Sequence, residues 1–221
     1  MNQPDASIIA SWKRNADPWV AAVRNEEIES RTLVTNAAIL DTVRAHAPQT
    51  ALDLGCGEGW LLRALPEVRM VGVDAIDRLV ESARTAGGGE FRLLSYEEIA
   101  GGQLQLAVDL AVCNFSLIGK EAVDGLFRAA PSYLRRGGHL VVQTVHPVIA
   151  CGEQAYVDGW REGSWAGFNS GFQDAPPWYF RTLSSWIALF ETNGLRVREM
   201  REPLHPRTGK PASLILVGQL I

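Results

Sequence analysis

The sequence lacks several features that identify particular classes of protein. No stretch approaches about 18 consecutive uncharged apolar residues, so a membrane-spanning helix is not predicted. Only three cysteines are present, Cys56, Cys113 and Cys151, and no two of them have the Cys-x-x-Cys spacing. We therefore expect neither a disulfide framework nor a zinc ribbon, but three small buried side chains. The four histidines show no spacing that predicts a metal site.

An excess of basic residues is also missing. The net charge is −4 and there is no long basic run, so no nucleic-acid partner is expected. The opening residues, "MNQPDASIIASWKRNADPW", mix acids and bases with only a short apolar patch, and lack the order of a secretory signal. These absences predict a cytoplasmic protein without a membrane partner.

Short apolar segments alternate with helical ones after an N-terminal region with helical spacing. The chain has 221 residues, of which 47% are hydrophobic, and this suits one domain with one core. Near-continuous apolar strands between helices are typical of a doubly wound α/β fold with a parallel sheet. The predicted strands are 50–54, 68–74, 90–95, 106–115 and 137–145, and the predicted helices are 59–65, 76–86 and 120–134.

The pattern changes after the fifth strand. Residues 147–181 are rich in Trp, Tyr, Phe, Gly and Pro, which indicates a structured insertion rather than a helix or a disordered linker. A helical stripe then precedes two strands, 195–200 and 213–220, which we expect to pair as an antiparallel hairpin. Pro131 predicts a kink or a break in the helix over 120–134, because proline has no backbone donor.

Three glycines at alternate positions follow the first strand in "ALDLGCGEGW". Glycines between a strand and a helix allow a ligand to approach the backbone closely. The dinucleotide pattern G-x-G-x-x-G fails, because Trp60 stands where its third glycine belongs, and Asp53 would repel a pyrophosphate. Asp74, at the end of the next strand, can accept both hydroxyls of a ribose. A nucleoside joined to an amino acid fits these residues, which describes S-adenosylmethionine.

Four motifs resemble, in order and spacing, those of the class I S-adenosylmethionine-dependent methyltransferases. They are "LDLGCGEGW", "VGVDAI", "DLAVCNFSLI" and "LRRGGHLVVQTVHP". The resemblance covers residues 50–146 and implies a Rossmann-like, seven-stranded, mostly parallel sheet with an antiparallel C-terminal hairpin. It predicts one methyltransferase domain over 1–221. Its parts are an N-terminal helical lid (1–48), a cofactor-binding core (49–146), a substrate-side insertion (147–181), and a final helix and hairpin (182–221).

The resemblance also implies roles for single residues around the cofactor. Gly55, Cys56 and Gly57 would wrap the methionine moiety. The other implied contacts are Asp53 to the amino group through water, Asp74 to the ribose, Ala75 and Ile76 beside the adenine, and the Asn114 backbone at the methionine end.

Two positions leave alternatives open. At the end of the third strand many relatives have an Asp that contacts the adenine, whereas this chain has Ser95 followed by Tyr96, so a hydroxyl or a backbone amide would replace that contact. Arg31 resembles the arginine that small-molecule members of the ubiquinone-biosynthesis type use for the cofactor carboxylate. A solvated helix charge is the alternative.

Methyl transfer needs mainly alignment and exclusion of water, and a general base only for some acceptors. His146, at the exit of the fifth strand, is the candidate base, and anchoring of the insertion is its alternative role. Arg181 would pair with an acidic acceptor or brace a helix start. The aromatic candidates for acceptor contact, which could instead form a small core of their own, are Trp12, Trp19, Trp160, Trp165, Trp178 and Tyr179.

The sequence thus predicts an enzyme that transfers a methyl group from S-adenosylmethionine to a small, apolar or aromatic acceptor by in-line displacement. "NFSL" stands where methyltransferases of nucleic-acid bases have Asn-Pro-Pro-Tyr, which disfavours a base as acceptor. The alternatives are a methyltransferase of RNA or protein and a non-catalytic S-adenosylmethionine-binding module. We expect a monomer or a homodimer, and the pattern does not identify the acceptor.

Overall fold

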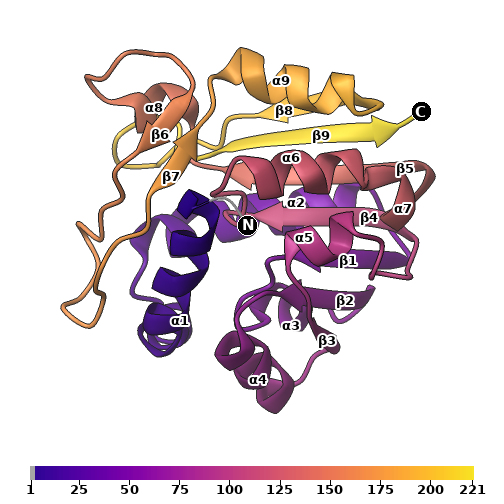
Figure 1. Ribbon diagram of the computed structural model, residues 1–221, viewed down its shortest axis with the longest axis horizontal. Coiled ribbons are helices and arrows are strands. Elements are labelled where there is room, and N and C mark those ends of the chain that lie inside the picture. Colours follow the sequence, from indigo (N-terminus) through magenta and orange to yellow (C-terminus); the bar gives the residue numbers. More distant parts are fainter. Residues whose placement is uncertain (1–2) are drawn as a thin grey trace.

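A seven-stranded sheet forms the centre of the computed structural model, which describes residues 3–221. Its strands are β1 (Thr50–Leu54), β2 (Arg69–Asp74), β3 (Glu90–Leu93), β4 (Val108–Asn114), β5 (Leu134–Thr144), β8 (Leu195–Arg201) and β9 (Leu214–Leu220). They lie in the order β3-β2-β1-β4-β5-β9-β8 (Figure 1). The first five are parallel, whereas β9 is antiparallel to β5 and β8. The predicted doubly wound fold with an antiparallel C-terminal hairpin is confirmed.

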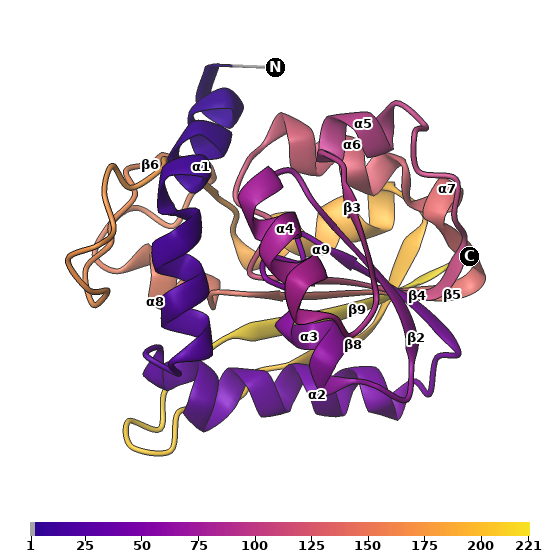
Figure 2. The ribbon, with the colours of Figure 1, turned by 90° about the horizontal axis from the view of Figure 1, so that it is seen from below.

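Helices cover both faces of this sheet (Figures 1 and 2). One apolar core lies between the sheet and α5 (Tyr96–Ala100), α6 (Glu121–Arg128), α7 (Ala130–Tyr133) and α9 (Leu183–Thr192). A second core lies on the other face, beneath α2 (Asn36–Ala45), α3 (Trp60–Ala64) and α4 (Asp77–Ala86). Burial on both faces explains why the parallel strands read as continuous apolar runs.

The helix predicted over 120–134 is broken, as Pro131 indicates. α6 ends at Arg128 and α7 starts at Ala130, with Pro131 in the first turn of α7. Proline is tolerated there because the first turn of a helix does not use its backbone donors. The break lets α7 turn directly into β5.

The N-terminal helix and the aromatic insertion lie side by side at one edge of the sheet (Figure 2). The helix α1 spans Gln3–Arg24, and the insertion contains α8 (Pro147–Cys151) and a small sheet of β6 (Gly159–Arg161) and β7 (Trp178–Phe180). The Asn15 amide nitrogen on α1 donates to the Gln173 carbonyl at 2.8 Å, and the Ser11 hydroxyl donates to the Asp174 carbonyl at 2.6 Å. These bonds attach the insertion to the helix.

Between α1 and α2 the chain makes a π-helical turn, η1 (Arg31–Thr35). Such turns interrupt regular helices and occur frequently at functional sites. Here the turn carries Arg31 at its first position.

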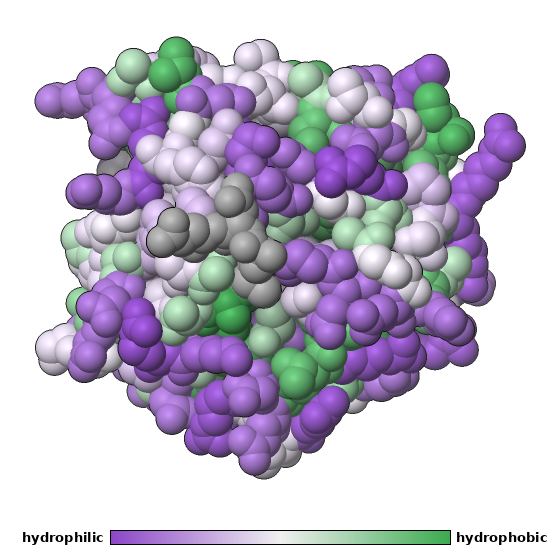
Figure 3. Space-filling model, in the orientation of Figure 1, coloured by the Kyte–Doolittle hydropathy of each residue, from purple (hydrophilic) through white to green (hydrophobic). Residues whose placement is uncertain are grey.

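The face shown in Figure 3 is mostly hydrophilic, with hydrophobic residues in small separate patches. Across residues 3–221, we find no helix with both the length and the apolar character needed to cross a membrane. The three cysteines are free and buried, as expected from their spacing.

Candidate functional site

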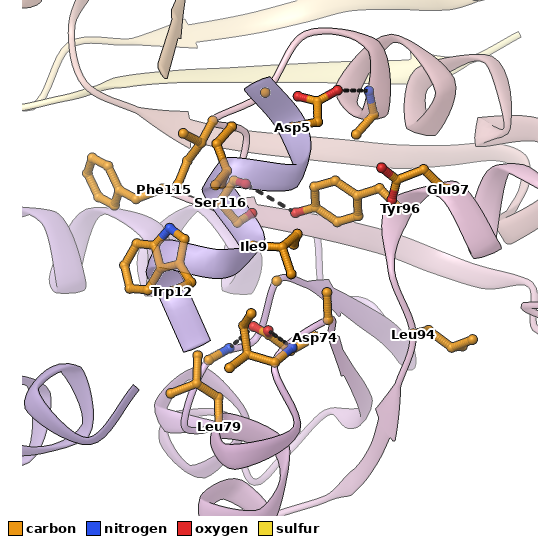
Figure 4. A pocket seen from close by; sticks show the side chains of 18 of the residues that line it. Asp5, Ile9, Trp12, Asp74, Leu79, Leu94, Tyr96, Glu97, Phe115 and Ser116 are labelled. Carbon is orange, nitrogen blue, oxygen red and sulfur yellow. Dashed lines mark hydrogen bonds between the residues drawn. The ribbon is translucent and has the colours of Figure 1, made fainter. Parts of the chain in front are cut away.

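A cavity of about 850 Å³, which includes solvent at its mouth, lies beneath α1 at the carboxyl ends of the parallel strands (Figure 4). In doubly wound folds this edge of the sheet is where ligands bind. Nine residues predicted from the sequence line it: Trp12, Trp19, Gly55, Gly57, Asp74, Ala75, Ile76, Tyr96 and Asn114. The cavity therefore brings together residues from α1 and from the ends of β1, β2, β3 and β4.

The glycine turn after β1 is shaped for close approach. Gly55 and Gly57 have φ angles of +78° and +57°, in the left-handed region that favours glycine. A Cβ atom at Gly55 would lie 2.4 Å from the Cβ of Ser116, so the turn has no room for a side chain there. At Cys56, which the resemblance places in the same wrap, the side chain is buried against Gly72 and does not line the cavity. Only its backbone could face a cofactor.

Asp74 has both carboxylate oxygens partnered by this backbone (Figure 4). The amide of Gly57 donates to Oδ2 at 2.8 Å, and the amide of Ile76 donates to Oδ1 at 2.9 Å. Burial raises the pKa of Asp74, and the two backbone hydrogen bonds oppose that rise. A carboxylate oxygen can accept more than one hydrogen bond, so Asp74 keeps capacity for the two hydroxyls of a ribose.

Asp53 lies deeper, beneath the turn. Its side chain is 2% exposed, and its Oδ1 has no hydrogen-bond partner within residues 3–221. Burial and then the nearby charge of Asp74 raise the pKa of Asp53 to about 8, whereas the charge of Arg31 lowers it. Asp53 does not line the cavity, which fits the predicted contact through a water molecule better than a direct one.

Arg31 lies between two aromatic rings. Its guanidinium carbon is 4.8 Å from the ring centre of Trp60 and 5.8 Å from that of Trp19, and its Nε donates to Asn36 Oδ1 at 3.2 Å. Burial lowers its pKa to about 10, so the group stays charged at neutral pH. Arg31 is half-buried and, like Asp53, does not line the cavity. A half-buried cation and a buried acid beside one glycine turn are the charges that the two ends of an amino acid require.

Ser95 is placed differently from the prediction. Its hydroxyl accepts from the Glu98 amide at 3.2 Å, and the Glu98 carboxylate accepts from the Ser95 amide at 2.7 Å, so the pair caps the start of α5. Ser95 does not line the cavity, whereas its neighbours Leu94, Tyr96 and Glu97 do. The predicted adenine contact by the Ser95 hydroxyl is therefore withdrawn, because the cap uses that group.

His146 also lies outside the cavity. Its ring is 5% exposed, and Nε2 lies 2.8 Å from the Glu202 carboxylate, which follows β8. It is the residue just before α8, where the insertion begins. We withdraw the prediction that His146 is a base, since it does not line the cavity and its ring is held by Glu202. Its alternative role as an anchor fits this position.

The aromatic candidates divide into two groups. Trp12 and Trp19 line the cavity and contact each other edge to face, with ring centres 5.1 Å apart. The four in the insertion do not line it and pack against neighbouring rings, as in the contact of Trp165 with Trp12 at 5.7 Å. The other contacts join Trp160 to Tyr179 and Trp178 to Phe180. These ring contacts are the kind expected of the alternative named for them, and Trp165 alone of the four packs against α1.

Arg181 braces the start of α6 instead of facing an acceptor. It donates to the carbonyls of Gly119 and Lys120, at 3.0 and 3.2 Å, and pairs with the Asp124 carboxylate at 3.0 Å. Its side chain is 4% exposed and absent from the cavity wall. The predicted pairing with an acidic acceptor is withdrawn because these groups already use the guanidinium.

Sequence reasoning missed one polar residue that holds the cavity closed. Asp5 on α1 accepts from the backbone amides of Lys120 and Ala122, each at 3.2 Å, and so caps α6, which has no capping side chain of its own. No local signal marks this contact, since its partners lie more than a hundred residues away. The remaining lining residues that the sequence did not indicate are Ile8, Ile9, Leu79, Leu94, Glu97, Phe115, Ser116, Ile118, Gly119 and Ala122.

Comparison with known proteins shows which family the chain matches. Residues 29–200 match the family described as "Methyltransferase domain". Trans-aconitate 2-methyltransferase of Acidovorax ebreus (strain TPSY) is 31% identical over 122 residues, which cover 53% of this chain and 46% of that protein. The chain thus spans about half the length of the curated relatives it matches.

Solved structures agree in fold. An S-adenosylmethionine-dependent methyltransferase from Mesorhizobium loti superposes with a TM-score of 0.60 at 22% identity, over 81% of this chain and 96% of the other. The 1,6-didemethyltoxoflavin-N1-methyltransferase of Burkholderia thailandensis superposes with a TM-score of 0.66 at 16% identity, over 100% of this chain and 91% of the other. The predicted fold is confirmed.

Proposed function

The chain belongs to the methyltransferase-domain family, and we propose that it transfers a methyl group from S-adenosylmethionine to a small, apolar or aromatic acceptor. The observation that carries this proposal is the cavity beneath α1, which joins the glycine turn and Asp74 to an apolar wall. The Mesorhizobium and Burkholderia structures, named as dependent on S-adenosylmethionine and as bound to S-adenosylhomocysteine, support the choice of cofactor.

Residues in and beside the cavity wall fit the chemical groups of that cofactor. Asp74 would hold the ribose hydroxyls, with Ala75 and Ile76 beside the adenine. Arg31 and Asp53, which do not line the cavity themselves, would hold the carboxylate and the ammonium from behind the glycine turn. When bound, the cofactor supplies a methyl group already activated on a sulfonium sulfur. The protein's part is to align the acceptor with that group and to exclude water, which can supply most of the rate acceleration.

Two observations support a small acceptor. The helix α1 and its Asp5 contact close the cavity on one side, which leaves little access for an RNA or protein substrate. The Acidovorax and Burkholderia proteins are both named for small-molecule acceptors. The free cysteines are typical of a reducing compartment, which supports the proposed cytoplasmic location.

A transfer assay tests the proposal. Purified protein is incubated with S-adenosylmethionine labelled on the methyl group and with separate small-molecule, RNA and protein fractions of a bacterial extract. Label should appear in the small-molecule fraction alone. Transfer to RNA or protein would contradict the proposed acceptor class, and binding of the cofactor without transfer to any fraction would favour the non-catalytic alternative.

A further inference from the structure

We propose that Glu58 is a positioning residue of the cofactor site, because it fastens the end of α1 to the glycine turn through Arg24. The proposal rests on the proposed methyl transfer and concerns how the same site closes over its cofactor. Glu58 lies in the turn between Gly57 and Gly59, and Gly57 lines the cavity. The Glu58 side chain does not line the cavity, so its effect on the cofactor passes through other residues.

The Glu58 carboxylate is buried and paired with two arginines. Its side chain is 0% exposed, and Arg63 Nη2 donates to each of its oxygens at 2.6 Å. Arg24 Nε donates to the same carboxylate at 3.0 Å. A buried charge is costly unless it is paired and hydrogen-bonded, and charge-assisted hydrogen bonds are the strong ones. The loss of either arginine would therefore leave this carboxylate with fewer donors than its burial requires.

The two arginines come from different helices and hold different parts of the site. Arg63 lies on α3, which begins directly after the turn, and its Nη1 also donates to the Glu58 carbonyl at 2.7 Å. Arg24 is the last residue of α1, which runs beside α4 (Figure 2). Its Nη2 donates to the carbonyl and the hydroxyl of Ser82 on α4, at 3.2 and 3.0 Å. Because Asp5 holds the other end of α1 to α6, the helix is fastened at both ends.

The contact of Arg24 with Glu58 sets the position of Trp19 above the turn. Trp19 precedes Arg24 by about one and a half helical turns and lines the cavity. Its ring nitrogen lies 3.5 Å from the place that a Cβ atom at Gly57 would occupy, so the ring covers the turn closely. The Gly57 amide in turn donates to Asp74, the proposed ribose acceptor. A shift of the end of α1 would move Trp19 away from the groups assigned to the cofactor.

Glu58 also acts on Arg31 through its charge. Burial lowers the pKa of Arg31 to about 10, and the charge of Glu58, followed by that of Asp53, opposes this fall. Arg31 is the cation proposed for the cofactor carboxylate. One buried acid in the turn therefore holds the end of the covering helix and helps to keep that cation charged.

Dissociation of S-adenosylhomocysteine tests whether Arg24 and Glu58 close the site. Binding to the full chain is first measured by calorimetry, and the dissociation rate is then measured by stopped-flow tryptophan fluorescence. Arg24→Gln removes the ion pair at a side chain that is 44% exposed, so the fold should be kept. We expect dissociation about tenfold faster, because the lost charge-assisted hydrogen bond holds the covering helix in the bound state. Arg24→Lys keeps the charge and should recover part of the loss.

Arg44→Gln is the matched control. Arg44 is 48% exposed and pairs with Glu67 at 2.8 Å. Its Nη2 also donates to the Ala64 carbonyl at 3.1 Å, so it has the same kinds of contact as Arg24, but they join α2 to α3 outside the cavity wall. Arg44→Gln should lower the free energy of unfolding about as much as Arg24→Gln and leave the dissociation rate unchanged. A residue that only stabilised the fold would not separate these two properties.

A double-mutant cycle shows whether the two residues act as one unit. Glu58→Gln should speed dissociation at least as much as Arg24→Gln, since it leaves both arginines without their carboxylate. The double variant should dissociate no faster than Glu58→Gln alone, because the ion pair is already lost there. If Glu58→Gln does not fold, the comparison of Arg24→Gln, Arg24→Lys and Arg44→Gln decides by itself.

Different failures have different meanings. If S-adenosylhomocysteine does not bind to the folded wild-type protein, the proposed function itself fails. If it binds, the positioning role is overturned by an unchanged dissociation rate in Arg24→Gln, by equal acceleration in Arg44→Gln, or by no recovery in Arg24→Lys. Independent effects that multiply in the double variant would also overturn it, since Glu58 would then act without Arg24.

Discussion

Asp53 and Asp74 are two acids on neighbouring strands with different surroundings. Asp74 accepts two backbone hydrogen bonds and reaches the cavity, whereas Asp53 lies beneath it with one oxygen unpaired. Burial raises the pKa of both. The unpaired acid is the group whose protonation should respond to a cationic ligand.

The protonation of Asp53 predicts a pH-dependent affinity for S-adenosylhomocysteine. With its pKa raised to about 8, Asp53 is largely protonated at pH 6–7 in the free protein. A ligand ammonium group favours the carboxylate, so binding should release a proton, and affinity should rise as the pH rises from about 6 to 8. Calorimetry in buffers of different ionisation enthalpy measures the proton release.

Asp53→Asn is the control, because an asparagine side chain has nearly the shape of the aspartate side chain but carries no group that titrates. Its affinity should be weaker and nearly independent of pH in that range, and an unchanged proton release would assign the effect to another group. In the free protein the folded pKa of about 8 exceeds the ordinary 3.8, so stabilisation from Asp53 is full below pH 3.8 and disappears by about pH 8. In Asp53→Asn the free energy of unfolding should therefore fall less between pH 3.8 and pH 8 than in the wild type.

Replacing Asp74 should weaken cofactor binding most. Asp74→Ala removes the acceptor for the ribose and two hydrogen bonds of the glycine turn, and we expect the Kd to rise about a hundredfold. Asp74→Asn keeps one acceptor oxygen and should lose about tenfold. Tryptophan fluorescence measures both, since Trp12 and Trp19 line the cavity. Equal affinity in all three proteins would refute the ribose assignment.

At this scale the sequence identified residues whose roles depend on local order along the chain. The glycine turn and Asp74 could be predicted because a strand, a turn and a helix follow one another there. The cap at Ser95 was missed, although Ser95 and Glu98 have the Ser-x-x-Glu spacing that marks a capping box in a sequence. The contacts of Arg181 could not be predicted, because the carbonyls at the start of α6 lie about sixty residues away along the chain.

The helix α1 determines how the cavity is closed. It lines one wall, rests on the aromatic insertion and reaches α6 through Asp5. Its place beside the cavity was predicted, but its attachment to α6 could not be. The helix α5 was missed although the capping box of Ser95 and Glu98 marks its start, and the turn η1 was missed because it lies inside a segment with helical spacing.

Removing the Asp5 contact should loosen this lid. Asp5→Ala leaves the first amides of α6 without their cap, and we expect the free energy of unfolding to fall by about 1–2 kcal/mol. S-adenosylhomocysteine should also dissociate faster, as stopped-flow fluorescence would show.

Ser7→Ala is the matched control on the same helix, since the Ser7 hydroxyl bonds only to the Pro4 carbonyl at an exposed site. It should change neither property appreciably. If Asp5→Ala also left the dissociation rate unchanged, the closure of the cavity would not depend on this contact.

The whole molecule is one sheet with a site at its carboxyl edge and a cover built from segments distant in sequence. The sheet order and the antiparallel hairpin could be predicted from alternating patterns and from four motifs in register. The wall that faces the acceptor could not, because α1 and the loop after β4 meet only in three dimensions. Because the cofactor residues follow one another along the chain and the acceptor wall does not, the sequence indicates the cofactor, whereas the acceptor has to be inferred from the cavity.

Calorimetric titration of the purified, folded chain with S-adenosylhomocysteine tests the central claim most directly. The account predicts one binding site per chain with a Kd in the micromolar range, and a much weaker site in Asp74→Ala. A folded wild-type protein that binds neither S-adenosylhomocysteine nor S-adenosylmethionine would contradict it.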